Sequence, residues 1–205
     1  MTSQVNAPNS PASTMFSTAI VTNNHDPEKI GRIKVKYPWS GESDESFWAR
    51  VSTPMAGDEQ GFYFIPEVEQ EVLVIFINGD INYPIIIGSL WSQGSLPPES
   101  NDDGKNNIRK IRSRSGHEIV FDDNDEGSAQ KLEIKSSSGH SIVLNDASGS
   151  EKISITDNAG SFIEFDATSK KISIQSDMEI NINSTNITLE ASGVLKLKGT
   201  MVEIN

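Results

Sequence analysis

The second half of the chain carries short apolar pairs that recur between turns as far as its last residues. In each pair one polar residue separates two apolar residues, as in Ile153-x-Ile155. Such alternation places successive side chains on opposite sides of a β-strand, one side apolar and the other hydrated. The pairs comprise Leu132, Ile134, Ile153, Ile155, Ile172, Ile174, Ile180, Ile182, Ile187, Leu189, Leu195, Leu197, Val202 and Ile204. Each of these strands needs a cover for its apolar side.

The sequence predicts neither a helix nor a second sheet that could cover these strands. From Ile180 onward the pairs are only seven or eight residues apart, as in Ile187, Leu195 and Val202, which leaves room for a short strand and a tight turn. A repeat array of this kind builds its core by stacking neighbours or by wrapping several chains around one axis. We expect a homotrimer in which each chain supplies one face of a triangular prism and the pairs form the core.

Composition excludes several classes of protein. The net charge of −12 argues against binding to nucleic-acid phosphates, and the absence of cysteine excludes disulfides and thiolate chemistry. No apolar run approaches the ~20 residues of a membrane helix, and the Ser- and Pro-rich start lacks the features of a signal peptide. Nothing in the sequence calls for a cofactor.

The first half has a different pattern, in which turn residues separate six short expected strands. Such close spacing favours a small antiparallel barrel. The expected strands are Thr18–Thr22, Gly31–Tyr37, Phe47–Thr53, Phe62–Ile65, Glu71–Ile77 and Ile85–Leu90. The run from Val72 to Ile77 is almost continuously apolar, which predicts burial on both faces.

The domain organisation follows from these two patterns. We expect a flexible arm at residues 1–16, a barrel at 17–91, a Pro- and Asp-rich linker at 92–107, and the β-repeats of a needle at 108–205. The needle opens with Ser115-Gly116-His117 before an Ile-Val-Phe run, and Ser138-Gly139-His140 repeats this motif before Ile-Val-Leu.

Both halves together resemble the central spike of contractile injection systems, which includes phage baseplate assembly protein V and the type VI valine-glycine repeat (VgrG) spikes. The resemblance covers about residues 17–205, and the barrel contributes its most specific segments. These are Gly31–Trp39 (GRIKVKYPW), Phe47–Val51, Ala56–Val68 and Glu71–Leu90, followed by the Ser-Gly-His repeats.

The resemblance implies an all-β fold, with an N-terminal barrel of the oligonucleotide/oligosaccharide-binding (OB) type and a C-terminal triple-stranded β-helix formed by a homotrimer. It implies a structural role in which the barrel sits on a baseplate hub protein and the needle pierces the target cell envelope. Contact with the target membrane would be transient. The protein would be assembled in the cytoplasm as part of a phage tail, injection particle or secretion apparatus. An adhesive or receptor-binding trimer resembling a tail fibre is the alternative.

Departures from the family pattern bear on enzymatic activity and on the tip. No lysozyme-like insert separates the barrel from the needle, and no nucleophile elbow, HExxH motif or P-loop is present, so we expect no enzyme. The His-x-His pair that binds iron in some spikes is also missing. We therefore expect a tip protein of the proline-alanine-alanine-arginine (PAAR) repeat type to dock on Met201, Val202, Glu203, Ile204 and Asn205. The alternative is a blunt, solvated end without a cap.

Two groups of residues are candidates for metal binding. Asp122, Asn124 and Glu126, with Glu133 further on, nearly reproduce the ligand spacing of an EF-hand calcium loop. An EF-hand loop joins two helices, whereas this segment joins two expected strands, which favours a solvated hairpin turn. His117 and His140 occupy equivalent positions, where a turn residue repeated with its motif is favoured over a metal ligand.

Overall fold

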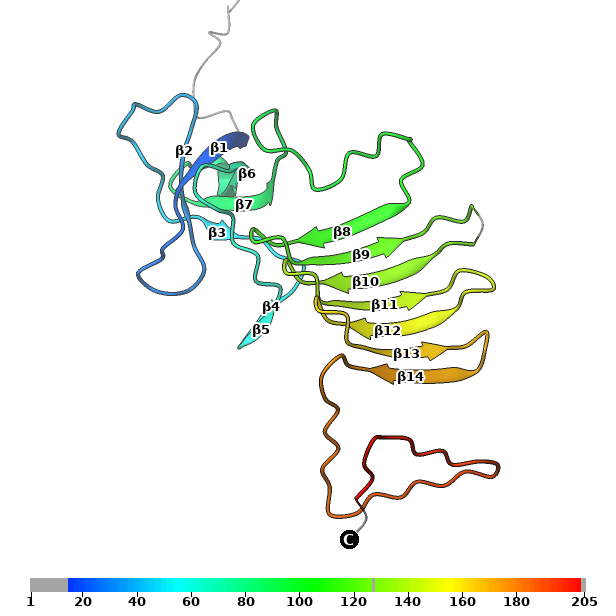
Figure 1. The fold of residues 1–205 in the computed structure, drawn as a ribbon. Helices are drawn as coiled ribbons and strands as arrows, with labels where there is room; N and C mark the ends of the chain where they lie inside the picture. Colours follow the sequence, from blue (N-terminus) through cyan, green and yellow to red (C-terminus); the bar gives the residue numbers. More distant parts are fainter. Residues whose placement is uncertain (1–14, 127, 204–205) are drawn as a thin grey trace, which may run out of the picture. The chain divides into compact units, whose positions relative to one another are not determined.

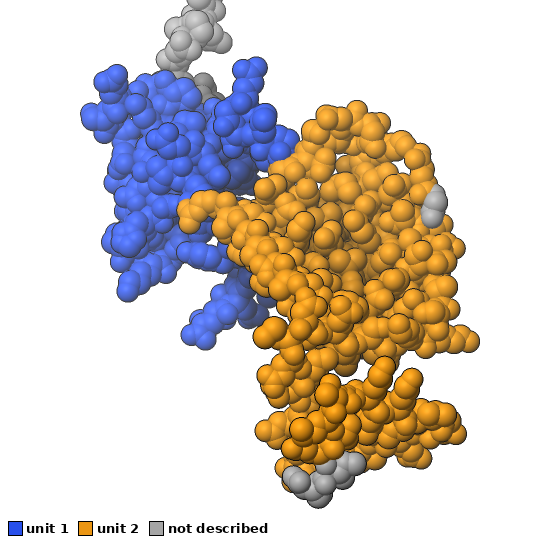
Figure 2. All heavy atoms as spheres, viewed as in Figure 1, with its two compact units in different colours: residues 1–97 blue, residues 98–205 orange. Residues whose placement is uncertain are grey.

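A computed structural model describes residues 15–126 and 128–203. The chain divides into two compact units, residues 1–97 and 98–205 (Figure 2), and β-strands are the main regular secondary structure described in each. No helix in the described part of the chain is long and apolar enough to cross a membrane.

The first unit is a curved five-stranded sheet with strand order β2-β1-β6-β7-β3 (Figure 1). Its strands are β1 (Phe16–Asn23), β2 (Lys34–Lys36), β3 (Arg50–Val51), β6 (Glu71–Phe76) and β7 (Pro84–Ser89). A short hairpin, β4 (Ala56–Gly57) with β5 (Gln60–Gly61), and the 3-10 turn η2 (Ile77–Gly79) complete the unit.

One face of this sheet closes on an apolar core. Ile33, Val35, Val72, Val74 and Ile86 are completely buried in it. Strand β6 alternates between buried and half-buried residues, so the expected burial on both faces is not met within one chain. The side chains between its buried residues point to a face that no other described segment of the unit covers fully.

The expected strand at Phe62–Ile65 does not form. Two hydrogen bonds hold this segment: Phe62 N–H donates to the Met55 carbonyl, and the Thr53 hydroxyl donates to the Phe62 carbonyl. Phe62, Tyr63 and Phe64 are all largely exposed, and consecutive aromatic residues cannot all point to one core. Their β-propensity suggested a strand, but the segment lacks the apolar–polar alternation of one.

The second unit contains a seven-stranded antiparallel sheet in which consecutive strands are neighbours, from β8 to β14 (Figure 1). The strands are β8 (Ile108–Arg112), β9 (Glu118–Asp122), β10 (Lys131–Lys135), β11 (Ser141–Asn145), β12 (Lys152–Thr156), β13 (Phe162–Asp166) and β14 (Lys171–Gln175). Each strand has five residues, so the sheet is a narrow ladder that grows by one hairpin at a time.

Within the single chain, the described residues after β14 form no strand. This segment holds the closely spaced pairs from Ile180 to Val202, whereas Ile204 and Asn205 lie outside the described residues. In the ladder, successive strands such as β11 and β12 begin eleven residues apart, which allows for a strand and a full turn. A repeat of seven or eight residues leaves room only for a short strand and a turn of two or three residues.

Candidate assembly interface

The register of the seven-stranded sheet brings most of the apolar side chains of its strands onto one face. One continuous cross-strand column consists of isoleucine alone, and a second runs beside it. The isoleucine column is Ile111, Ile119, Ile134, Ile142, Ile155, Ile163 and Ile174. The second column is Arg109, Phe121, Leu132, Leu144, Ile153, Phe165 and Ile172. We call this surface the apolar face.

The apolar face is uncovered in the single chain. Ile155 is 46% exposed, Phe165 43% and Ile174 56%. With strands ~4.8 Å apart, the face is roughly 30 Å long. Monomeric proteins rarely expose so long a continuous apolar surface, and such surfaces mark sites of interaction.

The opposite face, here called the polar face, is built mainly from charged and small polar side chains, with Val120, Val143 and Phe162 among them. Its central column contains Lys110, Val120, Glu133, Val143, Ser154, Glu164 and Ser173. The Lys152 ammonium lies 3.3 Å from the Glu164 carboxylate across two strands of this face. Polar side chains of this kind are stable in water, so only the apolar face needs a partner.

Six of the residues predicted as a trimer core lie together on the apolar face: Leu132, Ile134, Ile153, Ile155, Ile172 and Ile174. The register adds residues that the sequence prediction missed, including Ile119, Phe121, Ile142 and Leu144. They lie in Ile-Val-Phe and Ile-Val-Leu runs, in which Val120 or Val143 occupies the polar face and hides the alternation.

The predicted residues beyond the sheet are not brought together with this face by strand pairing. They are Ile180, Ile182, Ile187, Leu189, Leu195, Leu197 and Val202, all exposed, and Ile204, which lies outside the described residues. In the predicted tip segment, Met201 is 76% exposed and Val202 53%. Their apolar side chains are available to another chain.

The acidic loop proposed as a calcium site connects β9 and β10 as a hairpin turn. The side chains of Asp122 and Asn124 accept backbone N–H bonds two residues further on, and Glu126 forms an ion pair with Lys105. Glu133 lies within β10, where its carboxylate is 3.7 Å from the Lys131 ammonium. Among the described residues there is no group of three or more His, Cys, Asp or Glu side chains placed to hold a metal ion.

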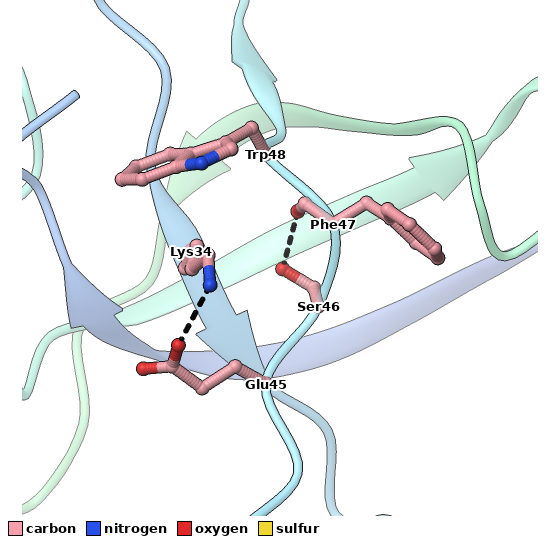
Figure 3. Close-up of a pocket in the computed structure, with 5 residues that line it drawn as sticks. All are labelled: Lys34, Glu45, Ser46, Phe47 and Trp48. Atoms are coloured by element: carbon pink, nitrogen blue, oxygen red, sulfur yellow. Dashed lines mark hydrogen bonds and ion pairs between the residues drawn. The ribbon is translucent and has the colours of Figure 1, made fainter. Parts of the chain in front are cut away.

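A shallow pocket of about 310 Å³ in the first unit is lined by Lys34, Glu45, Ser46, Phe47 and Trp48 (Figure 3). The Lys34 ammonium lies 5.4 Å from the Trp48 ring centroid and 3.0 Å from the Glu45 carboxylate. This ion pair lowers the pKa of Glu45, so the carboxylate stays charged and neutralises the lysine. The pocket therefore offers little attraction to an anion.

Beside this pocket, Asp26 fixes the loop between β1 and β2. Its carboxylate accepts bonds from the Arg32 guanidinium and from the N–H groups of Glu28, Ile30 and Arg32. The Asp26 side chain is only 3% exposed. The bonds from Arg32 and from the backbone hold the pKa of Asp26 well below its usual range, against the opposing effect of burial.

Arg32 is in turn placed over the ring of Trp48, with 5.7 Å between the guanidinium carbon and the ring centroid. The sequence prediction missed this network, although Asp26-Pro27 and Gly31-Arg32 were visible as a turn and a motif. The network is structural, because its charges are satisfied by one another.

Comparison with known proteins identifies the first unit more closely. Residues 17–91 match the family model of the type VI secretion system/phage-baseplate injector OB domain. Residues 17–91 are therefore similar to an injector OB domain, and we use that name for this segment. The expected resemblance to the spike proteins of contractile injection systems is confirmed, both by this match and by the relatives of the chain.

Three of these relatives indicate how far the similarity to spike proteins extends. The actin cross-linking toxin VgrG1 and the type VI secretion system spike protein VgrG3, both of Vibrio cholerae, are 35% and 34% identical over 104 residues, which is 47% of this chain. The spike protein VgrG2a of Pseudomonas aeruginosa is 38% identical over 82 residues, or 38% of this chain. In each case the match spans only 10% of the relative's own length, and the toxin name describes that whole protein.

Proposed function

We propose that this protein is the homotrimeric central spike of a contractile tail or injection machine. Three copies turn their apolar faces toward a common axis, and each supplies one side of a triangular prism. The observation that carries this proposal is the uncovered apolar face, with its column of seven isoleucines from Ile111 to Ile174. The injector OB domain and the spike relatives support the assignment.

Burial of the apolar face would favour assembly. Complete burial of an isoleucine side chain contributes about 1.5–3 kcal/mol, and these side chains are already about half covered, so each contributes on the order of 1 kcal/mol. Each of the three chains contributes both columns of its apolar face, so the favourable free energy of burial adds up over many side chains. The resulting prism has no uncovered apolar surface and no hinge along its length, which suits a rod that transmits thrust through an envelope.

We extend the trimer core to the pairs beyond β14. The described residues of this segment form no strand in the single chain, and we infer that the segments at Ile180, Ile187, Leu195 and Val202 pair between chains as a triple-stranded β-helix. Extended chains with unpaired N–H and C=O groups readily add neighbouring strands. The needle would then consist of a prism built from the β8–β14 sheets, followed by a thinner triple-stranded β-helix.

The proposal includes two protein partners. The injector OB domain would sit on a baseplate hub protein, and a tip protein of the PAAR-repeat type would cover Met201–Asn205. The exposed side chains of Met201 and Val202 support the second contact. The spike would be assembled with its apparatus in the cytoplasm and would cross the target membrane only on puncture.

Gel filtration with light scattering tests the trimer. The full chain should elute at about three times its mass of 22.4 kDa. A monomer at micromolar concentration would contradict the proposed spike. Antibody labelling of whole particles in electron micrographs then separates a spike, labelled on the tail axis at the baseplate, from an adhesive fibre, labelled at the periphery.

Co-purification tests the two partners. Residues 1–90 should retain the hub protein, whereas residues 107–205 should not; retention by the needle alone would reverse the proposed orientation. Deletion of Met201–Asn205 should abolish binding of the tip protein and leave the trimer intact. A deletion variant that still binds the tip protein would refute docking at this segment.

A further inference from the structure

The three turns along one edge of the seven-stranded sheet share one backbone geometry. They connect β8 to β9, β10 to β11 and β12 to β13. In the first two, Ser113 and Ser136 accept the backbone N–H of His117 and His140 through their hydroxyl groups, at 3.0 Å in both cases. In the third turn Asp157 accepts the N–H of Ser161 in the same way, at 2.8 Å.

The turns stack on one another through the two histidines. His117 Nδ1 accepts the backbone N–H of Ser137, which belongs to the next turn, at 3.2 Å. His140 Nδ1 accepts the N–H of Asn158, in the turn after that, also at 3.2 Å. Each histidine thus joins its own turn to a turn two strands further along the sheet.

The turns approach one another closely enough for this stacking. Gly116 and Gly139 have φ values of +90° and +97°, which only glycine adopts readily. A Cβ at Gly116 would lie 3.7 Å from Ser137 Cβ, and one at Gly139 would lie 3.6 Å from Asn158 Cβ. Each glycine therefore brings its turn into contact with the residue whose N–H the neighbouring histidine accepts.

The direction of these bonds determines the protonation state of both rings. A backbone N–H can only donate, so each Nδ1 must carry a lone pair, and the neutral ring must carry its proton on Nε2. In this state Nε2 is a hydrogen-bond donor and has no lone pair for a metal ion. The geometry therefore disfavours metal binding by His117 and His140.

We propose that His117 and His140 are pH-sensitive staples that hold one edge of the sheet together at neutral pH and release it in acid. Protonation of Nδ1 replaces the acceptor with a second donor, which then faces the N–H of Ser137 or Asn158. Histidine is the side chain that changes charge between pH 5 and 8. Acid therefore removes the bond between successive turns and adds a repulsive contact in its place.

Several charged groups lie on these turns and on the strand ends beside them: Arg112, Glu118, Arg114, Lys135 and Asp157. Arg112 and Glu118 are already paired, at 3.1 Å, and the Asp157 carboxylate accepts the N–H groups of Ala159 and Ser161. The third turn has serine in place of histidine and forms no staple, so the proposed acid response is confined to the two joints from β8 to β13.

Amide hydrogen exchange on the full chain tests the staples. Relative to the intrinsic exchange rates, protection of the Ser137 and Asn158 amides should fall roughly 3- to 10-fold between pH 8 and pH 5, the factor for an ordinary hydrogen bond. At pH 8, His117→Ala should remove this protection at Ser137 and spare Asn158, and His140→Ala should do the reverse. His25→Ala, the third histidine, in the other unit, is the matched control and should change neither amide.

Nitrogen-15 spectra of the imidazole rings give a second readout that needs no variant. At pH 8 both rings should be in the tautomer with the proton on Nε2. A proton on Nδ1 at pH 8 would overturn the proposal. Protection at Ser137 and Asn158 that is independent of pH, or unaffected by the matching alanine variant, would overturn it as well.

Discussion

The strands of both units alternate apolar and polar residues, but only the first unit buries its apolar side chains within the chain. In the injector OB domain the alternating strands curl around a shared core, and Ile86 on β7 is completely buried. In the seven-stranded sheet the alternation is more regular, yet Ile155 at its centre is 46% exposed. Regular alternation therefore defines an apolar face but does not by itself supply a cover for it.

Topology explains the difference between the two units. The order β2-β1-β6-β7-β3 brings strands from distant parts of the chain together, so the first sheet can bend back over its own core. The order from β8 to β14 is strictly sequential, and each hairpin only lengthens the ladder. Among the described residues of its unit, the narrow ladder of five-residue strands has no second layer, so its apolar face is left uncovered, and in the proposed spike two other copies cover it.

The largest effect is expected from a substitution on the apolar face, which should abolish trimer assembly. Ile155→Asp places a charge on the apolar face, and three such charges near one axis cost several kcal/mol each. Gel filtration with light scattering should show loss of the trimer at micromolar concentration. Thr156→Asp, one residue away on the polar face, is the control and should remain trimeric; equal sensitivity at both positions would contradict the assigned faces.

The next largest effect is expected from a substitution in the buried core of the OB domain. Ile86→Ala should destabilise this unit by about 2–5 kcal/mol, because it leaves a cavity in a fully buried site. Its neighbour Ile87 is 43% exposed on the opposite face of the same strand, so Ile87→Ala should cost clearly less. Tryptophan fluorescence during urea unfolding reports on this unit alone, since Trp39, Trp48 and Trp91 all belong to it.

A smaller effect is expected at the loop that Asp26 fixes. Asp26→Asn loses the charged partner of Arg32, so the OB domain should unfold at a lower urea concentration than the wild type. Glu28→Gln is the control: Glu28 also contacts Arg32, but its side chain is 66% exposed, and the change should have little effect.

The contribution of Asp26 should also depend on pH. Its pKa is lowered on folding, so its contribution is complete above the pKa of the unfolded chain, about 3.9, and is lost as pH falls through the folded value. Unfolding midpoints of wild type and Asp26→Asn should therefore differ by a constant amount at neutral pH and converge only in strong acid. If the difference between the two unfolding midpoints disappeared between pH 8 and pH 5, a group other than Asp26 would be responsible for the pH dependence.

The smallest effect is expected on the polar face of the ladder. Glu164→Gln removes a partly exposed ion pair with Lys152 and should cost about 0.2–1 kcal/mol. The difference should shrink further in high salt, because screening weakens pairs that water reaches. A loss as large as that of Ile155→Asp would mean that the polar face, too, is buried in the assembly.

The sequence predicted much of the fold where one local rule was sufficient. Alternation placed Ile153 and Ile155 on one face and Thr156 on the other, as the register of β12 confirms. It failed at Ile-Val-Phe runs, where three apolar residues in succession hide which two share a face. It also failed at Phe62–Ile65, where aromatic side chains suggested a strand that no core stabilises.

The sequence by itself determined that the chain is a β-protein, that its second half repeats, and that one side of those repeats is apolar. These properties depend on neighbours along the chain, because the two-residue period of a strand is local. The tertiary structure alone decided the strand order, the alignment of seven isoleucines across seven strands, and the contacts of Asp26 with Arg32 and of His117 with Ser137. Such contacts depend on which strands become neighbours and in which register, and that is set by packing of the whole chain.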